Sequence, residues 1–179
     1  MNMQRQFTAS MRFLHWLMAA MVLTMLGIGV AMVASPGSYH RLISIHRPLG
    51  ILILLLVVIR YANRRFSSMP PFPATMSAQE RLIASASELG FYALLFLQPL
   101  VGWGMLSAAR YPIVLFGSLH LFPILPHSLL LYTVLRPTHT VLAYLLFLMF
   151  IAHFAAILFH TLIVRDRLFN RMAPWKARA

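Results

Sequence analysis

Four long apolar runs constrain this sequence more than any other feature. They extend over about residues 13–33, 42–61, 89–109 and 138–164. A helix needs about 20 mostly apolar residues to cross the hydrocarbon core of a bilayer, and each run has that length. Because backbone polar groups must be satisfied within such a segment, the runs are expected to be helices. We therefore predict an all-α integral membrane four-helix bundle that forms a single membrane domain over residues 1–179.

The composition supports a membrane environment. Only 10% of the 179 residues are charged and 60% are hydrophobic, whereas a soluble domain carries about 25% charged residues. The net charge of +12 would by itself suggest a nucleic-acid partner. The basic residues flank the apolar runs, however, as they do in the loops of membrane proteins. The predicted partner is therefore the lipid bilayer, and no nucleic acid is expected.

The basic residues also predict the orientation of the helices. Eleven of them lie in the two terminal segments and in the connection between the second and third runs: Arg5, Arg12, Arg60, Arg64, Arg65, Arg81, Arg165, Arg167, Arg171, Lys176 and Arg178. The other two connections contain four: Arg41, Arg47, Arg110 and Arg136. Loops rich in lysine and arginine stay in the cytoplasm. We therefore predict a multi-pass protein with both termini cytoplasmic.

The connection over residues 110–137 is long, apolar and interrupted by four prolines. No proline-free run within it reaches the length of a membrane span. We expect it to lie on the outer face, with a short interfacial helix over residues 126–135.

The sequence has eight histidines and no cysteine, so a bound metal would need histidine, methionine or oxygen ligands. His40, His120 and His127 fall in connections and are interpreted as interfacial residues. Ionisable residues inside a span are costly and usually functional. Four histidines meet that description and are the candidate metal ligands: His15, His46, His139 and His153.

The positions of these four histidines along the helices predict two pairs. His139 and His153 are 14 residues apart, which places them on one helix face about 21 Å apart in depth. His46 is expected at the depth of His139, near the outer face, and His15 at the depth of His153. Two imidazoles that face each other suit a haem iron, which takes one axial ligand on each side. A zinc or copper site would need more ligands at one depth. Two b-type haems are therefore favoured, and a haem-free helical bundle is the remaining alternative.

Two further residues have open interpretations. His160 follows His153 by seven residues on the same face and would act as an interfacial anchor, a contact of a haem propionate or a competing inner ligand. Glu88 lies near the cytoplasmic start of the third helix. It would serve proton exchange, or pair with Arg81 or Arg60.

Several motifs carry a family resemblance. They are Arg12-Phe-Leu-His-Trp16, Ile45-His-Arg-Pro-Leu-Gly50, Gln98-Pro-Leu-Val-Gly-Trp103, Thr138-His-Thr-Val-Leu-Ala143, Ala152-His153 and the tail Asp166-Arg-Leu-Phe-Asn-Arg-Met-Ala-Pro174. Together they resemble the bacterial cytochrome b561 family of four-helix di-haem membrane proteins. The resemblance covers nearly the whole chain, and it assigns the haem-ligand positions to His15, His46, His139 and His153.

The resemblance implies a function in the bacterial inner membrane. Single electrons would pass between a periplasmic donor and ubiquinone, and some members resemble a superoxide:ubiquinone oxidoreductase. Arginines in the outer connections would attract an anion such as superoxide. The alternative is a membrane-anchoring cytochrome b subunit that passes electrons from a dehydrogenase or hydrogenase partner to quinone. That redox partner would dock on the periplasmic face.

Overall fold

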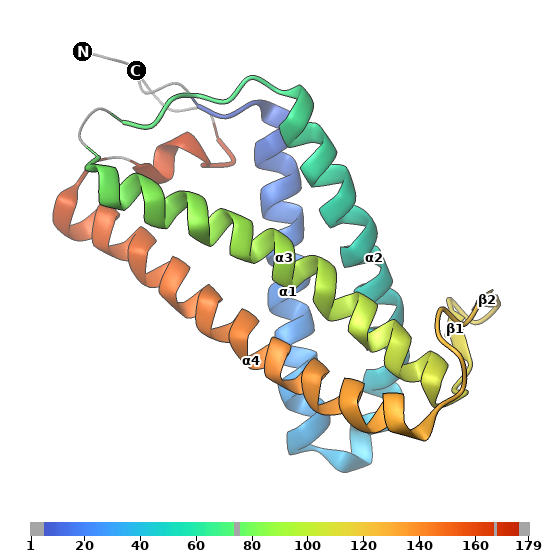
Figure 1. The fold of residues 1–179 in the computed structure, drawn as a ribbon. Helices are drawn as coiled ribbons and strands as arrows, with labels where there is room; N and C mark the ends of the chain where they lie inside the picture. The colour runs from blue at the N-terminus through green and yellow to red at the C-terminus, as the bar shows by residue number, and fades with distance from the viewer. Residues whose placement is uncertain (1–5, 74–75, 167, 176–179) are drawn as a thin grey trace.

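A computed structural model describes residues 6–73, 76–166 and 168–175 of the chain (Figure 1). It contains four long helices: α1 (Ala9–Ala34), α2 (Tyr39–Phe66), α3 (Ala78–Ala108) and α4 (Leu129–Leu158). Three short helical segments and one hairpin complete it: a 3₁₀ turn (Pro36–Ser38), a π-helical turn (Phe159–Val164), a 3₁₀ helix (Leu168–Arg171), and the strands β1 (Ile113–Leu115) and β2 (Leu119–Leu121). Within the described ranges, four helices are long and apolar enough to cross a membrane.

The helices are mostly longer than the apolar runs that predicted them. All four begin before the expected positions 13, 42, 89 and 138, and α2 continues past 61. The first turn of α3 is polar and is held by a capping box, in which Ser77 and Glu80 each bond the other's backbone N–H. Hydropathy detects only the part of a helix that lies in hydrocarbon. Capped turns outside that layer therefore escaped the prediction.

The structure corrects the prediction for residues 110–137. The expected interfacial helix over 126–135 does not form as a separate element, because helix α4 begins at Leu129 and runs through Pro137. The Ser128 side chain accepts a hydrogen bond from the Leu131 backbone N–H, which starts the helix there. The preceding residues form the antiparallel hairpin β1–β2, a short addition to a mostly helical fold. The turn of the hairpin uses positive φ angles at Phe116 and Gly117.

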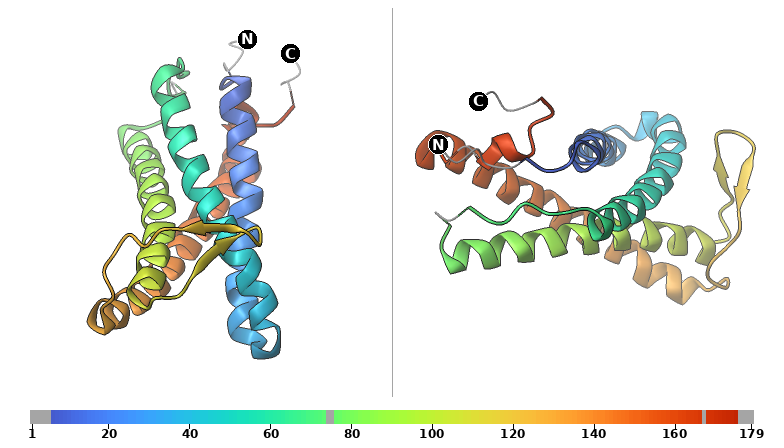
Figure 2. Two further views of the ribbon diagram at one scale, coloured as in Figure 1. Left: turned by 90° about the vertical axis from the view of Figure 1, so that its right-hand side faces the viewer. Right: turned by 90° about the horizontal axis from the view of Figure 1, so that it is seen from above.

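The helices pack as two neighbouring pairs. α1 lies against α2 and α3 against α4, and α2 also contacts α3 (Figures 1 and 2). Over the part of the chain that the structure describes, the backbone of α4 approaches those of α1 and α2 closely at very few points. The space between the two pairs is therefore spanned by side chains from helices that are not direct neighbours.

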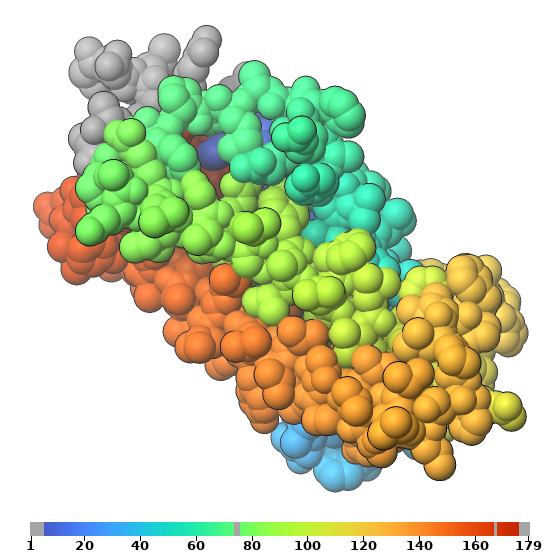
Figure 3. Space-filling view, viewed as in Figure 1, coloured from blue at the N-terminus to red at the C-terminus, as the bar shows by residue number. Residues whose placement is uncertain are grey.

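The outer surface of the helices is apolar. Figure 3 shows the face formed by α3 and α4. On these two helices, large side chains such as Leu89 and Tyr144 are each 71% exposed. A soluble protein rarely exposes apolar surface on this scale. The surface therefore fits contact with lipid acyl chains along the length of the helices.

The C-terminal segment packs against the beginning of α1. The Trp16 indole donates to the Met172 carbonyl over 2.8 Å, and the Phe7 backbone N–H donates to the Arg171 carbonyl over 3.0 Å. The Arg171 guanidinium is buried and donates to the Pro71 carbonyl over 2.6 Å. This network joins three segments that are distant in sequence, at the end of the molecule where α1 begins.

Candidate haem sites

The outer candidate site joins α2 to α4. His46 comes from α2 and His139 from α4, and the centroids of their half-buried rings lie 6.2 Å apart with an interplanar angle of 69°. The two helices that carry these rings are not packed directly on each other. The rings therefore meet across the space between the two helix pairs.

This separation suits two imidazoles on opposite sides of one metal ion. With metal–nitrogen bonds of roughly 2 Å on each side, the two ring centres would lie about 6 Å apart. The nitrogen atoms also fit. The Nδ1 atom of His139 lies 3.1 Å from the Gln98 carbonyl oxygen, which leaves Nε2 without a proton. The Nδ1 atom of His46 is buried without a hydrogen-bond partner.

Unpartnered polar atoms gather around the same pair. Five buried side-chain polar atoms of the described residues lack a hydrogen-bond partner, and three of them belong to His46, Arg47 and Gln98. Buried polar atoms without partners are rare in proteins, and a bound group would provide the missing partners. The outer site therefore fits a haem, whose iron and polar edge would provide partners.

Three internal prolines converge on the outer pair. Pro48 lies two residues after His46, Pro137 two residues before His139, and Pro99 directly after Gln98. Each proline removes one helical hydrogen bond and frees a carbonyl group one turn earlier. Pro137 was predicted to lie in the connection, so the sequence analysis missed this arrangement. The spacing of one or two residues between each proline and His46, Gln98 or His139 could have indicated this arrangement from the sequence.

The inner candidate site joins α1 to α4. The Nδ1 atom of His15 lies 3.1 Å from an Arg60 guanidinium nitrogen. The ring of His153 contacts Phe91 of α3 edge to face, at a centroid distance of 5.3 Å. Both histidines are half-buried. The two predicted ligands thus come from helices that do not pack directly on each other.

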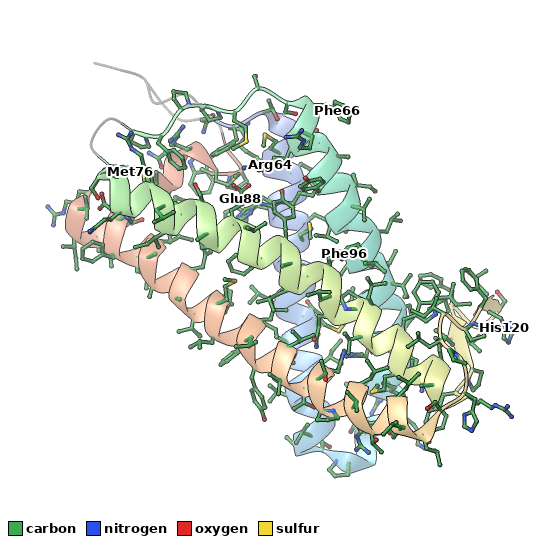
Figure 4. The ribbon with its side chains drawn as sticks, viewed as in Figure 1. Arg64, Phe66, Met76, Glu88, Phe96 and His120 are labelled. Carbon is green, nitrogen blue, oxygen red and sulfur yellow. The ribbon has the colours of Figure 1, made fainter. Side chains whose placement is uncertain are left out.

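The remaining histidines have other contacts. His40, His120 and His127 are exposed, and His120 lies on the hairpin (Figure 4). His40 was expected in a connection but lies in the first turn of α2, because that helix begins at Tyr39. His160 lies in the π-helical turn after α4, where its Nδ1 atom is 2.6 Å from an Asp166 carboxylate oxygen. The second Asp166 oxygen accepts the Leu168 backbone N–H over 3.0 Å. His160 is therefore held at the end of α4 by the carboxylate that also orders the following turn.

Glu88 pairs with Arg64 rather than with either predicted arginine. Two guanidinium nitrogens of Arg64 donate to the two carboxylate oxygens over 2.5 and 2.7 Å (Figure 4). The expectation of Arg81 or Arg60 as partner was wrong, because the packing of α2 on α3 brings Arg64 to the level of Glu88. Arg60 instead lies over the Tyr92 ring, 5.9 Å from its centroid.

We expect Glu88→Gln to have a small structural effect. The two side chains are 30% and 34% exposed, so solvent screens the pair and its loss should cost less than about 1 kcal/mol. Thermal unfolding in detergent would measure this change, with Gln79→Leu as an exposed control on the same helix. Loss of haem from Glu88→Gln would contradict the assignment of Glu88 to a structural ion pair.

Comparison with known proteins identifies the family. A sequence profile of the prokaryotic cytochrome b561 family matches residues 6–175. The chain belongs to this family. It is also 37% identical over 107 residues to cytochrome b561 homolog 2 of Escherichia coli (strain K12). That alignment covers 58% of this chain and 56% of the relative, so the chain spans about half the length of the curated relative that it matches.

Membership of the cytochrome b561 family indicates which group the candidate histidines would bind. The chain is a prokaryotic cytochrome b561 with four helices that are long and apolar enough to cross a membrane, and this family implies bound b-type haem. Histidine is an axial ligand of haem iron in proteins. The four histidines above lie within the long helices, and the ring centroids of His46 and His139 are 6.2 Å apart.

Proposed function

We propose that this cytochrome b561 binds two b-type haems and carries single electrons across the bacterial inner membrane, from a periplasmic donor to ubiquinone. His46 and His139 would hold the outer haem, and His15 and His153 the inner one. The observation that carries the proposal is the 6.2 Å contact between the His46 and His139 rings, together with the second pair about 21 Å deeper along α4. Haem iron between two imidazoles supplies reversible one-electron transfer.

In this function the protein would bind the two haems, hold them in a fixed orientation and insulate them from water. The imidazoles of each pair come from helices held apart by their neighbours, so their separation is set by the fold. The surrounding apolar helices exclude water, which limits leakage of electrons and protons along the path. Both termini are assigned to the cytoplasm from the distribution of basic residues, which puts His46 and His139 on the periplasmic side.

Superoxide is the donor that the outer face favours. Arg47 lies next to His46, and one of its guanidinium nitrogens is 3.3 Å from the Pro112 carbonyl oxygen, while Nε has no partner. Cationic groups of this kind raise the local concentration of anions. Two superoxide ions would each give up one electron and leave as dioxygen. One ubiquinone would take both electrons and two protons to become ubiquinol.

The purified cytochrome in liposomes that contain ubiquinone tests this proposal. We expect a steady supply of superoxide to reduce the haems and to form ubiquinol, and added superoxide dismutase to abolish both. His139→Ala should lower ubiquinol formation to the rate of protein-free liposomes, whereas His120→Ala, in the exposed hairpin, should retain the full rate. Failure of superoxide to reduce either haem would overturn superoxide as the donor.

The exposed hairpin favours a second candidate function. Phe116, Leu119 and Phe122 are 70%, 55% and 67% exposed at the end of the molecule that also contains the outer histidine pair. Exposed apolar patches often mark protein interfaces. In this function the hairpin would dock a dehydrogenase or hydrogenase subunit, and the haems would pass its electrons to quinone. Haems that are inert to superoxide, but reduced by a co-purified catalytic subunit and its substrate, would favour it.

A further inference from the structure

Helix α3 contains no histidine, yet it makes several polar contacts to a candidate ligand. Gln98 and Gly102 lie four residues apart on α3 and therefore share one face. That face meets the His139 ring of α4. Neither residue has a role predicted from the sequence, although both belong to the motif over residues 98–103.

Gln98 makes three contacts with His139. Its backbone carbonyl oxygen lies 3.1 Å from Nδ1 of His139. Its amide nitrogen donates to the His139 backbone carbonyl over 3.1 Å and lies 3.3 Å from Nε2 of the ring. Because both neighbours of the amide nitrogen are acceptors, the orientation of the Gln98 amide follows from its surroundings rather than from an arbitrary choice of nitrogen and oxygen.

These contacts specify one tautomer of His139. A carbonyl oxygen only accepts, so Nδ1 of His139 must carry the proton that lies between them. The amide nitrogen only donates, so Nε2 must present its lone pair. Both contacts therefore place the proton on Nδ1 and the lone pair on Nε2. In the haem-bound protein that lone pair would bind iron in place of the Gln98 amide, which would keep its hydrogen bond to the His139 carbonyl. A ligand histidine that donates its other N–H to a carbonyl is also held in orientation and becomes more basic.

Gly102 provides the room for this arrangement. A Cβ atom at position 102 would lie 3.0 Å from Cε1 and 3.3 Å from Nδ1 of the His139 ring. Such contacts are closer than side chains normally tolerate, so the ring would have to shift. Gly29 of α1 is different, because a Cβ atom there would meet nothing within 4 Å. The glycine at 102 thus permits the close approach of α3 to the ring.

We propose that Gln98 and Gly102 are positioning residues for the outer haem: they fix the tautomer and orientation of its ligand His139. The inference rests on the proposed function, in which His139 binds the outer haem iron. The hydrogen bond from Nδ1 to the Gln98 carbonyl increases the basicity of the ligand, which favours ferric iron. Displacement of the ring should therefore raise the midpoint potential of the outer haem and leave the inner haem unchanged.

Graded substitutions test this inference in the full-length cytochrome. Gly102→Ala should shift the low-spin electron paramagnetic resonance signal of one haem only, and should raise its reduction equilibrium constant about threefold, which is roughly 28 mV at 59 mV per tenfold. Gly102→Val should lower the haem content from two per chain to one. Gln98→Leu should give a smaller shift of the same signal. Gly29→Ala and Gln79→Leu are the matched controls and should match the wild type.

The outcomes separate this inference from the proposed function. A wild-type protein without two haems contradicts the proposed function itself. A wild type with two haems, and unchanged signals and potentials in Gly102→Ala and Gln98→Leu, overturns only the positioning role. Equal changes in both haems would also overturn it, because they indicate general destabilisation. Should Gly102→Val fail to fold, Gly102→Ala and Gln98→Leu decide the question.

Discussion

Replacement of His139 by alanine is expected to lower the haem content from two per chain to one. His139 is half-buried beside His46, and alanine has no nitrogen with which to bind iron. A haem with one axial ligand left would lose the second protein bond that anchors it. The reduced-minus-oxidised difference spectrum, with haem extracted and quantified per chain, measures the result.

The pairing of the ligands is tested by combining substitutions. His46→Ala should also leave one haem, and the double variant His46→Ala/His139→Ala should still retain one, because both residues serve the same site. His139→Ala/His153→Ala should retain none, because each substitution removes a different haem. His120→Ala is the control and should keep both. Two haems in His139→Ala, or none in the His46→Ala/His139→Ala double variant, would contradict the pairing.

The features that the sequence could predict are those set by distance along one helix. A fixed rise per residue converts the spacing of His139 and His153 into a separation in depth. Hydropathy located the four helices because their exteriors are apolar along most of their length. The cost of a polar residue inside a span selected the histidines. These arguments need no knowledge of which helices are neighbours.

The features that could not be predicted depend on contacts between helices. Gln98 and Gly102 reach His139 because α3 packs on α4, and Arg64 reaches Glu88 because α2 packs on α3. The pattern of residues along one helix indicates which of its faces is functional. It does not indicate which other helix packs against that face. The hairpin escaped prediction for a related reason, because its three-residue strands are too short to show a periodicity.

Arg60 is expected to raise the midpoint potential of the inner haem. Its guanidinium lies 3.1 Å from Nδ1 of His15, a predicted ligand of that haem. Contact with the Tyr92 ring holds the guanidinium in place. Reduction adds one negative charge to the haem, so a nearby positive charge stabilises the ferrous form. Removal of that charge should therefore lower the potential.

Arg60→Met should lower the midpoint potential of the inner haem by about 59 mV, which corresponds to a tenfold change in its reduction equilibrium constant. A unit charge about 8 Å away, at an effective dielectric constant of about 20, contributes roughly 2 kcal/mol, and the half-buried position of Arg60 reduces that value.

A potentiometric titration followed by optical spectroscopy measures the shift. Arg60→Lys should retain most of the potential because it keeps the charge, and Arg65→Met, at an exposed arginine of the same helix, should leave it unchanged. An equal shift in Arg60→Lys would instead assign the effect to the lost hydrogen bond with His15, and a shift confined to the outer haem would place Arg60 at the wrong site.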